Sequence, residues 1–433
     1  MAFAPDGRLF LTERMSGNIR VFANGSLDPT PWATVSVFHG GSYAEQGLLG
    51  IAVDPDFLNN RFVYVFHTKA GGGENVIARL QEVSGRGSNY TVLTPPGAIN
   101  SVTLHNGGPL IFGQDGTLYA ATGDSYNTTL PQDPQSWNGK VLRFEVPNLT
   151  IPASNPFPGS PVYSLGHRNQ FGLSIHPVTG DLFQTENGGA LMDEVNRIVP
   201  GGNYGWPTIE GREVTPDPAF VDPLEWYQPT AALTGCDFFS GENYPVTYQN
   251  AWFFTDYNHN RIRVMTFDAT GQIVLGQTLF DDLPGAGYGI KMGPDGNLWY
   301  LTHDYGGYGA DELGRYTHQN EPMPSAHVTA VANRAVGGSI TIGVHAHNGD
   351  LVVPWLSWSH YSTPFPTPFG DQWIPVDVVL PSMVVAADDR AYLGLSIPNV
   401  SSVIGRAAYV QAVSYTVSTG SIQATNPAKH VLR

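Results

Sequence analysis

The chain has 433 residues, of which 21 are Lys or Arg and 37 are Asp or Glu, so its formal net charge is −16. This acidic balance disfavours binding to nucleic acid or to anionic membranes, which select basic surfaces. The sequence also has no run of about 18 apolar residues that would span a bilayer. Glycine (50), proline (34) and aromatic residues (12%) are abundant and charged residues are scarce (13%), which is typical of many short strands joined by turns. The single cysteine, Cys236, excludes an internal disulfide and any cysteine-rich metal centre.

A hairpin pattern recurs along residues 1–316. In each copy a Pro or Asp-Gly turn, or an equivalent, joins two stretches of alternating apolar residues, and this combination is a strong short-range signal for a β-hairpin. The six copies are residues 3–13, 52–68, 111–124, 174–188, 246–265 and 291–307. They predict an all-β fold, a six-bladed β-propeller in which loops from every blade line one central channel. An irregular β-sandwich or a solenoid is the alternative interpretation of the same turns.

The hairpin pattern stops after Tyr316. Residues 317–325, THQNEPMPS, contain two prolines and predict a linker. Residues 326–433 then show short alternating strands with a different spacing, which predict a small C-terminal β-sandwich. This accessory domain has almost no charged clusters, so we expect a role in packing, adhesion or targeting, with carbohydrate binding as an alternative.

The N-terminus has neither the charged segment nor the apolar segment of a secretory signal, because Met1 leads directly into the first hairpin. We expect residues upstream of this chain, since a propeller is normally closed by a strand from one terminus and a blade would otherwise be one strand short. Low lysine and abundant glycine, proline and aromatic residues are typical of exported bacterial proteins. A secreted or periplasmic location is therefore predicted, with a cytoplasmic location as the alternative.

The densest group of polar motifs lies in residues 163–207. A GHRN motif at 166–169 precedes a short apolar strand, and an ENGG motif at 186–189 follows the next strand. The two strands are joined by a turn at 177–180, so two polar loops flank one hairpin. Because binding and catalytic groups usually lie on loops held by rigid strands, this segment predicts part of a functional site.

Five blocks of sequence appear in a fixed order along the predicted propeller. They are EQGLLGIAVDPDFLNNRFVYV (45–65), HNGGPLIFGQDGTLYAATGD (105–124), NGKVLRFEV (138–146), GHRN (166–169), and ENGG (186–189) followed by DEVNRIVPGGNYGWP (193–207). In order and spacing they resemble the soluble glucose/sorbosone (aldose sugar) dehydrogenases, which use pyrroloquinoline quinone (PQQ) on a six-bladed propeller. The resemblance implies PQQ- and calcium-dependent oxidation of an aldose at C1 to the lactone, with electrons passed to an external acceptor.

The resemblance assigns catalytic and substrate roles to three residues by motif. His105, at the start of HNGGPL, matches the base that removes the hydroxyl proton of the sugar, a role that suits imidazole because its pKa lies near neutrality. Arg168 matches a catalytic and cofactor-binding arginine that contacts the quinone oxygens as a planar cation. Asp124 matches a carboxylate of the substrate pocket. From the residues alone each could instead be structural, as a strand-end histidine, an arginine tying loops together and a turn-capping aspartate.

Metal and further cofactor contacts are also implied by the resemblance. The calcium beside the cofactor maps to the backbone carbonyls of Gly188 and Gly189, which are the hard oxygen ligands that calcium takes. A second calcium site maps to Glu194 and Tyr204. A cofactor-binding glutamine of the family falls at Glu45, and Gln46 is the adjacent residue that could take this role.

The chain departs from the family in the last two blades. Basic residues of the family fall at Asn258, Ala286 and Tyr288, and the aspartate that precedes the base falls at Leu104. Each charged hydrogen bond contributes about 1.5 to 3 kcal/mol, so three missing cations weaken the expected affinity for a tricarboxylate cofactor. The nearby basic residues that could substitute are His259, Arg261, Arg263 and Lys291.

These observations predict a sugar oxidoreductase that acts on CH–OH groups, with a small-molecule sugar as substrate. A propeller of the same family that binds glycan or protein without turnover is the alternative, and a lactonase on the same architecture is a further one. The sequence contains no nucleotide-binding GxxxxGK[ST] or GxGxxG loop, no HExxH zinc motif and no GxSxG nucleophile elbow. Nucleotide-dependent, zinc-peptidase and serine-hydrolase activities are therefore disfavoured.

Overall fold

The computed structural model describes residues 1–189, 191–212, 217–241, 244, 248–268, 271, 273–303, 312–316, 326–332, 339–346, 349–359, 365–368, 370–372, 375–385, 390–396, 407–417, 420–424 and 428–431. The predicted linker, residues 317–325, lies outside them. Nearly all described elements are strands, accompanied by one short helix, α1 (Phe57–Asn60). A helix that crosses a bilayer needs about 20 residues, and none in the described segments is long and apolar enough.

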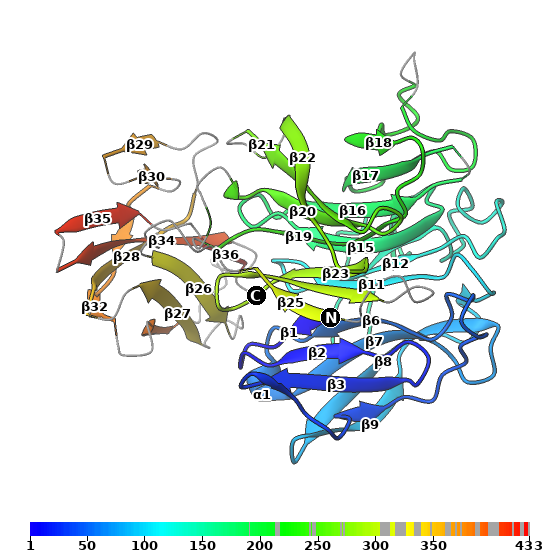
Figure 1. Ribbon diagram of the computed structural model, residues 1–433, viewed down its shortest axis with the longest axis horizontal. Coiled ribbons are helices and arrows are strands. Elements are labelled where there is room, and N and C mark those ends of the chain that lie inside the picture. The colour runs from blue at the N-terminus through cyan, green and yellow to red at the C-terminus, as the bar shows by residue number, and fades with distance from the viewer. Residues whose placement is uncertain are drawn as a thin grey trace.

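Residues 2–315 form six antiparallel sheets that follow one another in chain order and make the blades of a propeller (Figure 1). The first contains β1 (Ala2–Phe3), β2 (Leu9–Thr12), β3 (Asn18–Ala23), β4 (Ser26–Leu27) and β5 (Ala33–Thr34). The second contains β6 (Leu48–Val53), β7 (Phe62–Thr68), β8 (Glu74–Val83), β9 (Arg86–Val92) and β10 (Ile99–Asn100). The third contains β11 (Gly107–Phe112), β12 (Leu118–Thr122), β13 (Lys140–Phe144) and β14 (Val162–Leu165).

The last three blades complete the ring. The fourth contains β15 (Asn169–Ile175), β16 (Leu182–Asn187), β17 (Asp193–Ile198) and β18 (Glu225–Tyr227). The fifth contains β19 (Leu233–Phe238), β20 (Trp252–Asp256), β21 (Arg261–Phe267) and β22 (Val274–Asp282). The sixth contains, among the described residues, β23 (Ala286–Met292), β24 (Leu298–His303) and β25 (Glu312–Arg315). The predicted six-bladed propeller is confirmed.

The first strand of each blade lies at the channel and contacts the first strand of the next blade, from β1 through β6, β11, β15 and β19 to β23. The propeller closes between the sixth and first blades, where the indole of Trp299 packs edge-on against the side chain of Phe3. These inner strands approach each other closely. A Cβ on Gly50 of β6 would lie 2.0 Å from the carbonyl oxygen of Gly108 on β11, so only glycine fits there.

The hydrophobic core is divided among the interfaces between blades. Five clusters of buried apolar residues fill the spaces between consecutive blades, from the first to the sixth. Between the fourth and fifth blades the cluster includes Phe183, Trp252 and Phe254, and it also holds the free thiol of Cys236. Because each blade buries both of its faces against its neighbours, the loops at the channel mouths are held on a rigid frame.

The fifth hairpin copy occupies a different position within its blade from the other five copies. In those five the turn joins the first and second strands of a blade, as in β11 and β12. In the fifth copy the turn at 257–260 joins the second strand, β20, to the third, β21. The first strand, β19, has the sequence LTGCDF, which contains no turn signal, and a longer connection over 239–251 separates it from β20.

Beyond the propeller, three further sheets form the C-terminal β-sandwich, which Figure 1 shows on one side of the blades. One contains β26 (Ala326–Ala332), β27 (Ser339–Ala346) and β33 (Arg390–Ser396). Another contains β28 (Leu351–Ser357), β31 (Val378–Val379), β32 (Met383–Val384), β34 (Ala407–Thr416), β35 (Ser421–Ala424) and β36 (Ala428–Val431). The small third sheet pairs β29 (Phe365–Thr367) with β30 (Gly370–Gln372). The domain limits at 316 and 326 stay predictions.

Candidate active site

The polar motifs of the sequence meet at one mouth of the channel. His105 and Arg168 lie just before β11 and β15, the inner strands of the third and fourth blades, and Glu45 lies before β6. Asp124 follows the end of β12 and Glu186 lies near the end of β16, and antiparallel pairing brings both strand ends to the same mouth. The repeated blade geometry therefore gathers these side chains from distant parts of the sequence.

His105 and Asp124 form a buried pair. The distance from His105 Nδ1 to Asp124 Oδ1 is 2.8 Å, and the two residues are 6% and 1% exposed. Because a carboxylate accepts at Nδ1, the neutral imidazole carries its proton on that nitrogen and presents Nε2 as an acceptor. This is the tautomer that a general base requires.

The backbone around this pair is strained. His105, Ser125 and Tyr126 have positive φ angles of 59°, 52° and 56°, which non-glycine residues rarely adopt. The exposed ring of Tyr126 lies parallel to the imidazole of His105, with 4.1 Å between the ring centroids and 10° between the planes. Such strain persists where the surrounding structure enforces it, and it is frequent at functional sites.

Asp124 is fully occupied by donors from the protein. Besides His105, its Oδ1 accepts the backbone N–H of Tyr126 at 2.8 Å, and its Oδ2 accepts the indole N–H of Trp206 at 2.9 Å. A buried carboxylate with three donors is well suited to hold an imidazole in place. We therefore place Asp124 behind His105, and the substrate contact expected from the sequence stays a prediction.

Arg168 presents a guanidinium group that has no carboxylate partner among the described residues. One terminal nitrogen donates to the backbone carbonyl of Asn187 at 3.1 Å, and the group lies over the ring of Trp206, 5.3 Å from its centroid. Its backbone N–H donates to Glu186 Oε1. The loop is therefore fixed through the main chain, while the cationic charge stays available to an anionic ligand.

The histidine of the GHRN motif has a structural role. His167 is buried, with Nδ1 2.8 Å from Glu186 Oε2 and Nε2 2.8 Å from Ser164 Oγ. Its ring stacks on Tyr204 at a centroid distance of 4.7 Å. Both ring nitrogens are thus engaged, and Glu186 links this histidine to the backbone of Arg168. The His–Glu pair holds the loop that carries the arginine.

Glu45 contacts the loop that carries His105 and the loop that carries Arg168, whereas the side chain of Gln46 bonds to Ser101. Glu45 accepts from the backbone N–H of Asn106 at 3.1 Å and from the side chain of Asn169 at 3.1 and 3.2 Å, and these asparagines directly follow the candidate base and arginine. Burial raises the pKa of the Glu45 carboxyl group. Gln46 is buried and donates to Ser101 Oγ at 3.1 Å. Of the two, Glu45 is the one placed beside the candidate site.

The ENGG loop offers oxygen atoms beside Arg168. The amide groups of Gly188 and Gly189 donate to the carboxylates of Asp193 and Glu210. A Cβ on Gly188 would lie 1.9 Å from a backbone carbonyl oxygen, so close packing requires glycine here. The adjacent Asn187 Oδ1 is buried and has no hydrogen-bond partner among the described residues. An unpaired buried acceptor of this kind fits a bound cation.

Glu194 and Tyr204 engage different partners. Glu194 Oε1 accepts the backbone N–H of Gly211 at 2.6 Å, and the hydroxyl of Tyr204 donates to the carbonyl of Arg197 at 2.6 Å. Burial, and then the charge of Glu186 on the neighbouring strand, raises the pKa of Glu194 to about 8. Within the described residues no cluster of three or more His, Cys, Asp or Glu suits a metal ion. The second calcium site stays a prediction.

The fifth and sixth blades present uncharged groups at the three positions where the resemblance predicts cations, Asn258, Ala286 and Tyr288. The side chain of Asn258 donates to a backbone carbonyl at 3.0 Å, Ala286 is buried, and Tyr288 is 41% exposed. The ring of Tyr288 packs edge-on against Tyr257 and His303. None of these three side chains carries a charge that could bind an anionic cofactor.

The basic residues near these positions are held by other groups. Arg263 donates to Asp256 at 2.9 and 2.7 Å, and His259 Nδ1 lies 2.8 Å from the same carboxylate. Arg261 is paired with a carboxylate at 3.2 Å. Lys291 donates to a backbone carbonyl at 3.2 Å and lies near the far end of β23, away from this mouth. None of the four replaces the missing cations in this arrangement.

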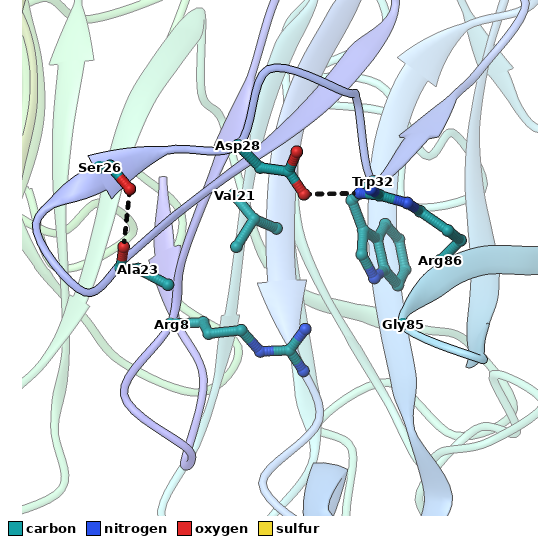
Figure 2. A pocket seen from close by; sticks show the side chains of 8 residues that line it. All are labelled: Arg8, Val21, Ala23, Ser26, Asp28, Trp32, Gly85 and Arg86. Atoms are coloured by element: carbon teal, nitrogen blue, oxygen red, sulfur yellow. Dashed lines mark hydrogen bonds and ion pairs between the residues drawn. The ribbon is translucent and has the colours of Figure 1, made fainter.

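A separate cavity of about 310 Å³ lies on the outer strands of the first two blades (Figure 2). It is lined by Arg8, Val21, Ala23, Ser26, Asp28, Trp32, Gly85 and Arg86. Its cations are neutralised, since Arg8 pairs with Glu82 at 2.7 Å and Arg86 pairs with Asp28 at 2.8 Å. The cavity shares no residue with the candidate site, so we assign it no role in the chemistry.

These features define a β-propeller with a candidate acid–base and anion-binding centre at one mouth. The sequence profile of the family described as glucose/sorbosone dehydrogenase matches residues 1–309. The chain belongs to this family, and it is an oxidoreductase that acts on the CH–OH groups of sugars.

Known proteins show the same relationship. An oxidoreductase from Thermus thermophilus, described as a glucose dehydrogenase, is 37% identical with a TM-score of 0.61, and the match covers 70% of this chain and 89% of that one. The PQQ-bound aldose sugar dehydrogenase from Streptomyces coelicolor is 30% identical with a TM-score of 0.63, covering 72% and 92%. Quinoprotein glucose dehydrogenase B from Acinetobacter calcoaceticus is 31% identical over 242 residues, which are 49% of this chain and 50% of that protein.

Two residues of the site were missed by sequence reasoning. Trp206 lies within the GNYGWP part of a family block, yet only the structure shows that its indole reaches Asp124. Tyr126 follows the ATGD motif and stacks on His105. The block around Trp206 was a usable signal. Nothing in the sequence around Tyr126 indicates the stacking, because it depends on two consecutive positive φ angles.

Proposed function

We propose that this chain binds PQQ and calcium at the mouth of the channel and oxidises an aldose at C1 to the lactone. The observation that carries this proposal is the buried His105–Asp124 pair beside the guanidinium group of Arg168, which has no carboxylate partner among the described residues. An imidazole base and a cation available for an anionic cofactor are the two groups that the reaction requires from the protein.

In the proposed mechanism His105 is the base. Its Nε2 takes the proton of the C1 hydroxyl group, while Asp124 keeps the proton on Nδ1 and stabilises the imidazolium that forms. PQQ bound at this mouth would supply the electrophilic, hydride-accepting chemistry that the protein side chains lack. Arg168 orients the cofactor and stabilises the negative charge that develops on it. The exposed face of the Tyr126 ring bounds the position of the sugar next to His105.

The residues of the fourth blade fit the cofactor and its calcium. The unpaired Asn187 Oδ1 and the carbonyl oxygens of Gly188 and Gly189 are the hard donors that calcium takes. Glu45 is in our proposal a neighbour that fixes both candidate loops, through the asparagines after His105 and Arg168. The carboxylate of Glu194 lies in the same blade, and a second calcium there, with Tyr204 as the other ligand, would offset its repulsion with Glu186.

The electron acceptor and the cellular location of the protein complete the proposal. The electron acceptor is in our proposal external to the chain, as the family resemblance implies. We propose a secreted or periplasmic location on the basis of the composition.

One experiment tests this proposal directly. The purified chain is titrated with PQQ in the presence of calcium, and dye-linked oxidation is measured over a panel of aldoses. We expect saturable binding at micromolar concentrations or below and turnover that chelation of calcium abolishes. The absence of saturable binding would overturn the proposal.

The alternative function is binding of a glycan or protein without turnover, which the uncharged groups at Asn258, Ala286 and Tyr288 favour. Calorimetry with the same sugars in the absence of cofactor separates the two functions. Tight sugar binding without PQQ, combined with no oxidation when PQQ is added, would support the alternative.

A further inference from the structure

We propose that Trp206 is a positioning residue with two separable actions, one on the His105–Asp124 pair through its indole N–H and one on Arg168 through its ring. This inference rests on the proposed function for its catalytic meaning. It assigns to one side chain the connection between the base and the cofactor-binding cation.

The first action is a hydrogen bond to the carboxylate behind the base. Trp206 Nε1 donates to Asp124 Oδ2 at 2.9 Å, while Asp124 Oδ1 faces His105 Nδ1 at 2.8 Å. The indole therefore draws negative charge toward the oxygen that does not contact the imidazole. Hydrogen bonding stabilises the charged form of a carboxylate and lowers its power to stabilise a neighbouring imidazolium. Trp206 thereby limits how strongly Asp124 can stabilise an imidazolium ion at position 105.

The second action is the support of Arg168. Its guanidinium group lies 5.3 Å from the centroid of the Trp206 ring, within the range of a cation–π contact. An aromatic face holds a guanidinium group without adding a negative charge, whereas a carboxylate would neutralise it. The indole therefore orients the cation and leaves its charge for the cofactor.

The position of Trp206 is fixed by its own backbone. Its N–H donates to the carbonyl of Gly166 at 3.0 Å, and its carbonyl accepts from the side chain of Gln132 at 2.8 Å. Gly166 begins the GHRN motif and Gln132 belongs to the third blade, so the loop that carries Trp206 is tied to both blades of the site. A side chain anchored in this way is preorganised for both contacts.

The two actions are separated by two substitutions. Trp206→Phe keeps an aromatic face under Arg168 and removes the N–H donor, while Trp206→Leu removes both. For Trp206→Phe we expect PQQ affinity within about 2-fold of the wild type, and for Trp206→Leu a loss of about 2- to 5-fold, which is the scale of an exposed cation–π contact. For both we expect the acid limb of the kcat/KM profile to move upward by about 0.5 to 1 pH unit.

The decisive readout is independent of turnover. The imidazole pKa of His105 is measured by NMR in the cofactor-free chain, with its signal assigned by comparison with His105→Asn. The groups that face this ring are Asp124, Glu45 and Tyr126. Only the donors to Asp124 change in Trp206→Phe, so we expect an upward shift of about 0.5 to 1 unit.

A matched control is available in the same blade. Trp226 belongs to the outer strand β18, and the guanidinium group of Arg212 lies over its ring, 5.2 Å from the ring centroid. Trp226→Phe should leave the pKa of His105 unchanged. An equal shift in both Trp→Phe variants, or no shift in Trp206→Phe, would overturn the proposal.

A double-mutant cycle keeps the test decisive if one variant is unstable. Asp124→Asn removes the carboxylate charge and should lower the pKa of His105, and in that background Trp206→Phe should have no further effect. Additive shifts would show that Trp206 acts on His105 by another route. If PQQ does not bind at all, the proposed function fails, and the NMR shift still decides whether Trp206 acts on His105 through Asp124.

Discussion

Two blades of the propeller, the third and the fifth, each carry a histidine–aspartate pair at the same mouth, and only one of the two pairs has the surroundings of the proposed base. In both pairs Nδ1 lies 2.8 Å from the carboxylate, in His105–Asp124 of the third blade and in His259–Asp256 of the fifth. Both aspartates lie at or just beyond the end of the second strand of their blade. The environments differ. His105 has 7% of its side chain exposed and His259 has 39%.

The difference lies in what else each aspartate holds. Asp256 forms an ion pair with Arg263 at 2.7 Å, so the charges of these two side chains cancel. Asp124 accepts an indole N–H instead, and the cation of that side, Arg168, lies over the same indole. The same scaffold thus carries an ion-paired cluster at the fifth blade, whereas at the third and fourth blades it carries the His105–Asp124 pair and an arginine, Arg168, that has no salt bridge among the described residues.

The largest effect expected from this comparison is the loss of the base. His105→Asn should reduce kcat by about 100-fold or more, the usual contribution of a general base, whereas His259→Asn should change it by less than about 2-fold. The measurement is dye-linked aldose oxidation with saturating PQQ and calcium, with thermal unfolding to verify the fold. Comparable losses in both variants would show that the two halves do not differ as the geometry indicates.

The next effect concerns the two arginines. Arg168→Met should weaken PQQ binding by about 10- to 100-fold, because a charged hydrogen bond contributes about 1.5 to 3 kcal/mol. Arg263→Met removes a cation that Asp256 already neutralises, so PQQ affinity should change by less than about 3-fold. Equilibrium titration of the cofactor measures both. An Arg263→Met variant that binds as weakly as Arg168→Met would place the fifth blade in the cofactor site.

Much of this half-site could be predicted from the sequence, because the information is local. The hairpin repeats predicted the blades, and the resemblance carried by the HNGGPL and GHRN motifs assigned roles to His105 and Arg168. The first strand of the fifth blade was missed because LTGCDF contains no turn signal. Its blade was recognised only from its second and third strands.

The remaining part of the site depends on contacts between distant segments. The contact of Trp206 with Asp124 joins residues 82 positions apart, and no periodicity in either segment indicates it. The same applies to Glu45, whose carboxylate accepts from Asn169, a residue 124 positions away in the sequence. The ion pair between Arg263 and Asp256 could not be predicted from the sequence either. Strand alternation indicates which face of the sheet a side chain occupies, but it does not identify the residue that the side chain contacts there.

The junction between the two halves should be sensitive to acid. At the fourth blade His176 Nδ1 accepts the backbone N–H groups of Val178 and Thr179 at 3.3 and 3.1 Å, and its ring packs against Phe238 and Phe267 of the fifth. Burial lowers the pKa of His176 from 6.5 to about 4. Between these values the unfolded chain binds more protons than the folded one, so stability is present above about 6.5 and falls as the pH drops toward 4.

Chemical denaturation at several pH values measures this loss. We expect a decrease of about 1 to 2 kcal/mol between pH 7 and pH 5 that is attributable to His176. His176→Asn keeps a side-chain acceptor for the turn and does not titrate, so its stability should depend less on pH by that amount. An identical pH dependence in the two proteins would exclude His176 as the acid-sensitive group of the junction.

The smallest effect is a gain, and it tests whether the uncharged half limits cofactor binding. Tyr288 is 41% exposed and lies where the resemblance predicts a cation, so Tyr288→Arg should tighten PQQ binding by about 3- to 10-fold through one partly exposed charged hydrogen bond. Leu279→Arg is the matched control, because Leu279 is 49% exposed but lies on β22, the outer strand of the fifth blade. A tightening in Tyr288→Arg alone, reduced by added salt, would show that the missing cation faces the cofactor. An equal gain in PQQ affinity in both variants would show that only the net charge of the protein matters. Unchanged PQQ affinity in both variants would indicate that position 288 does not contact the cofactor.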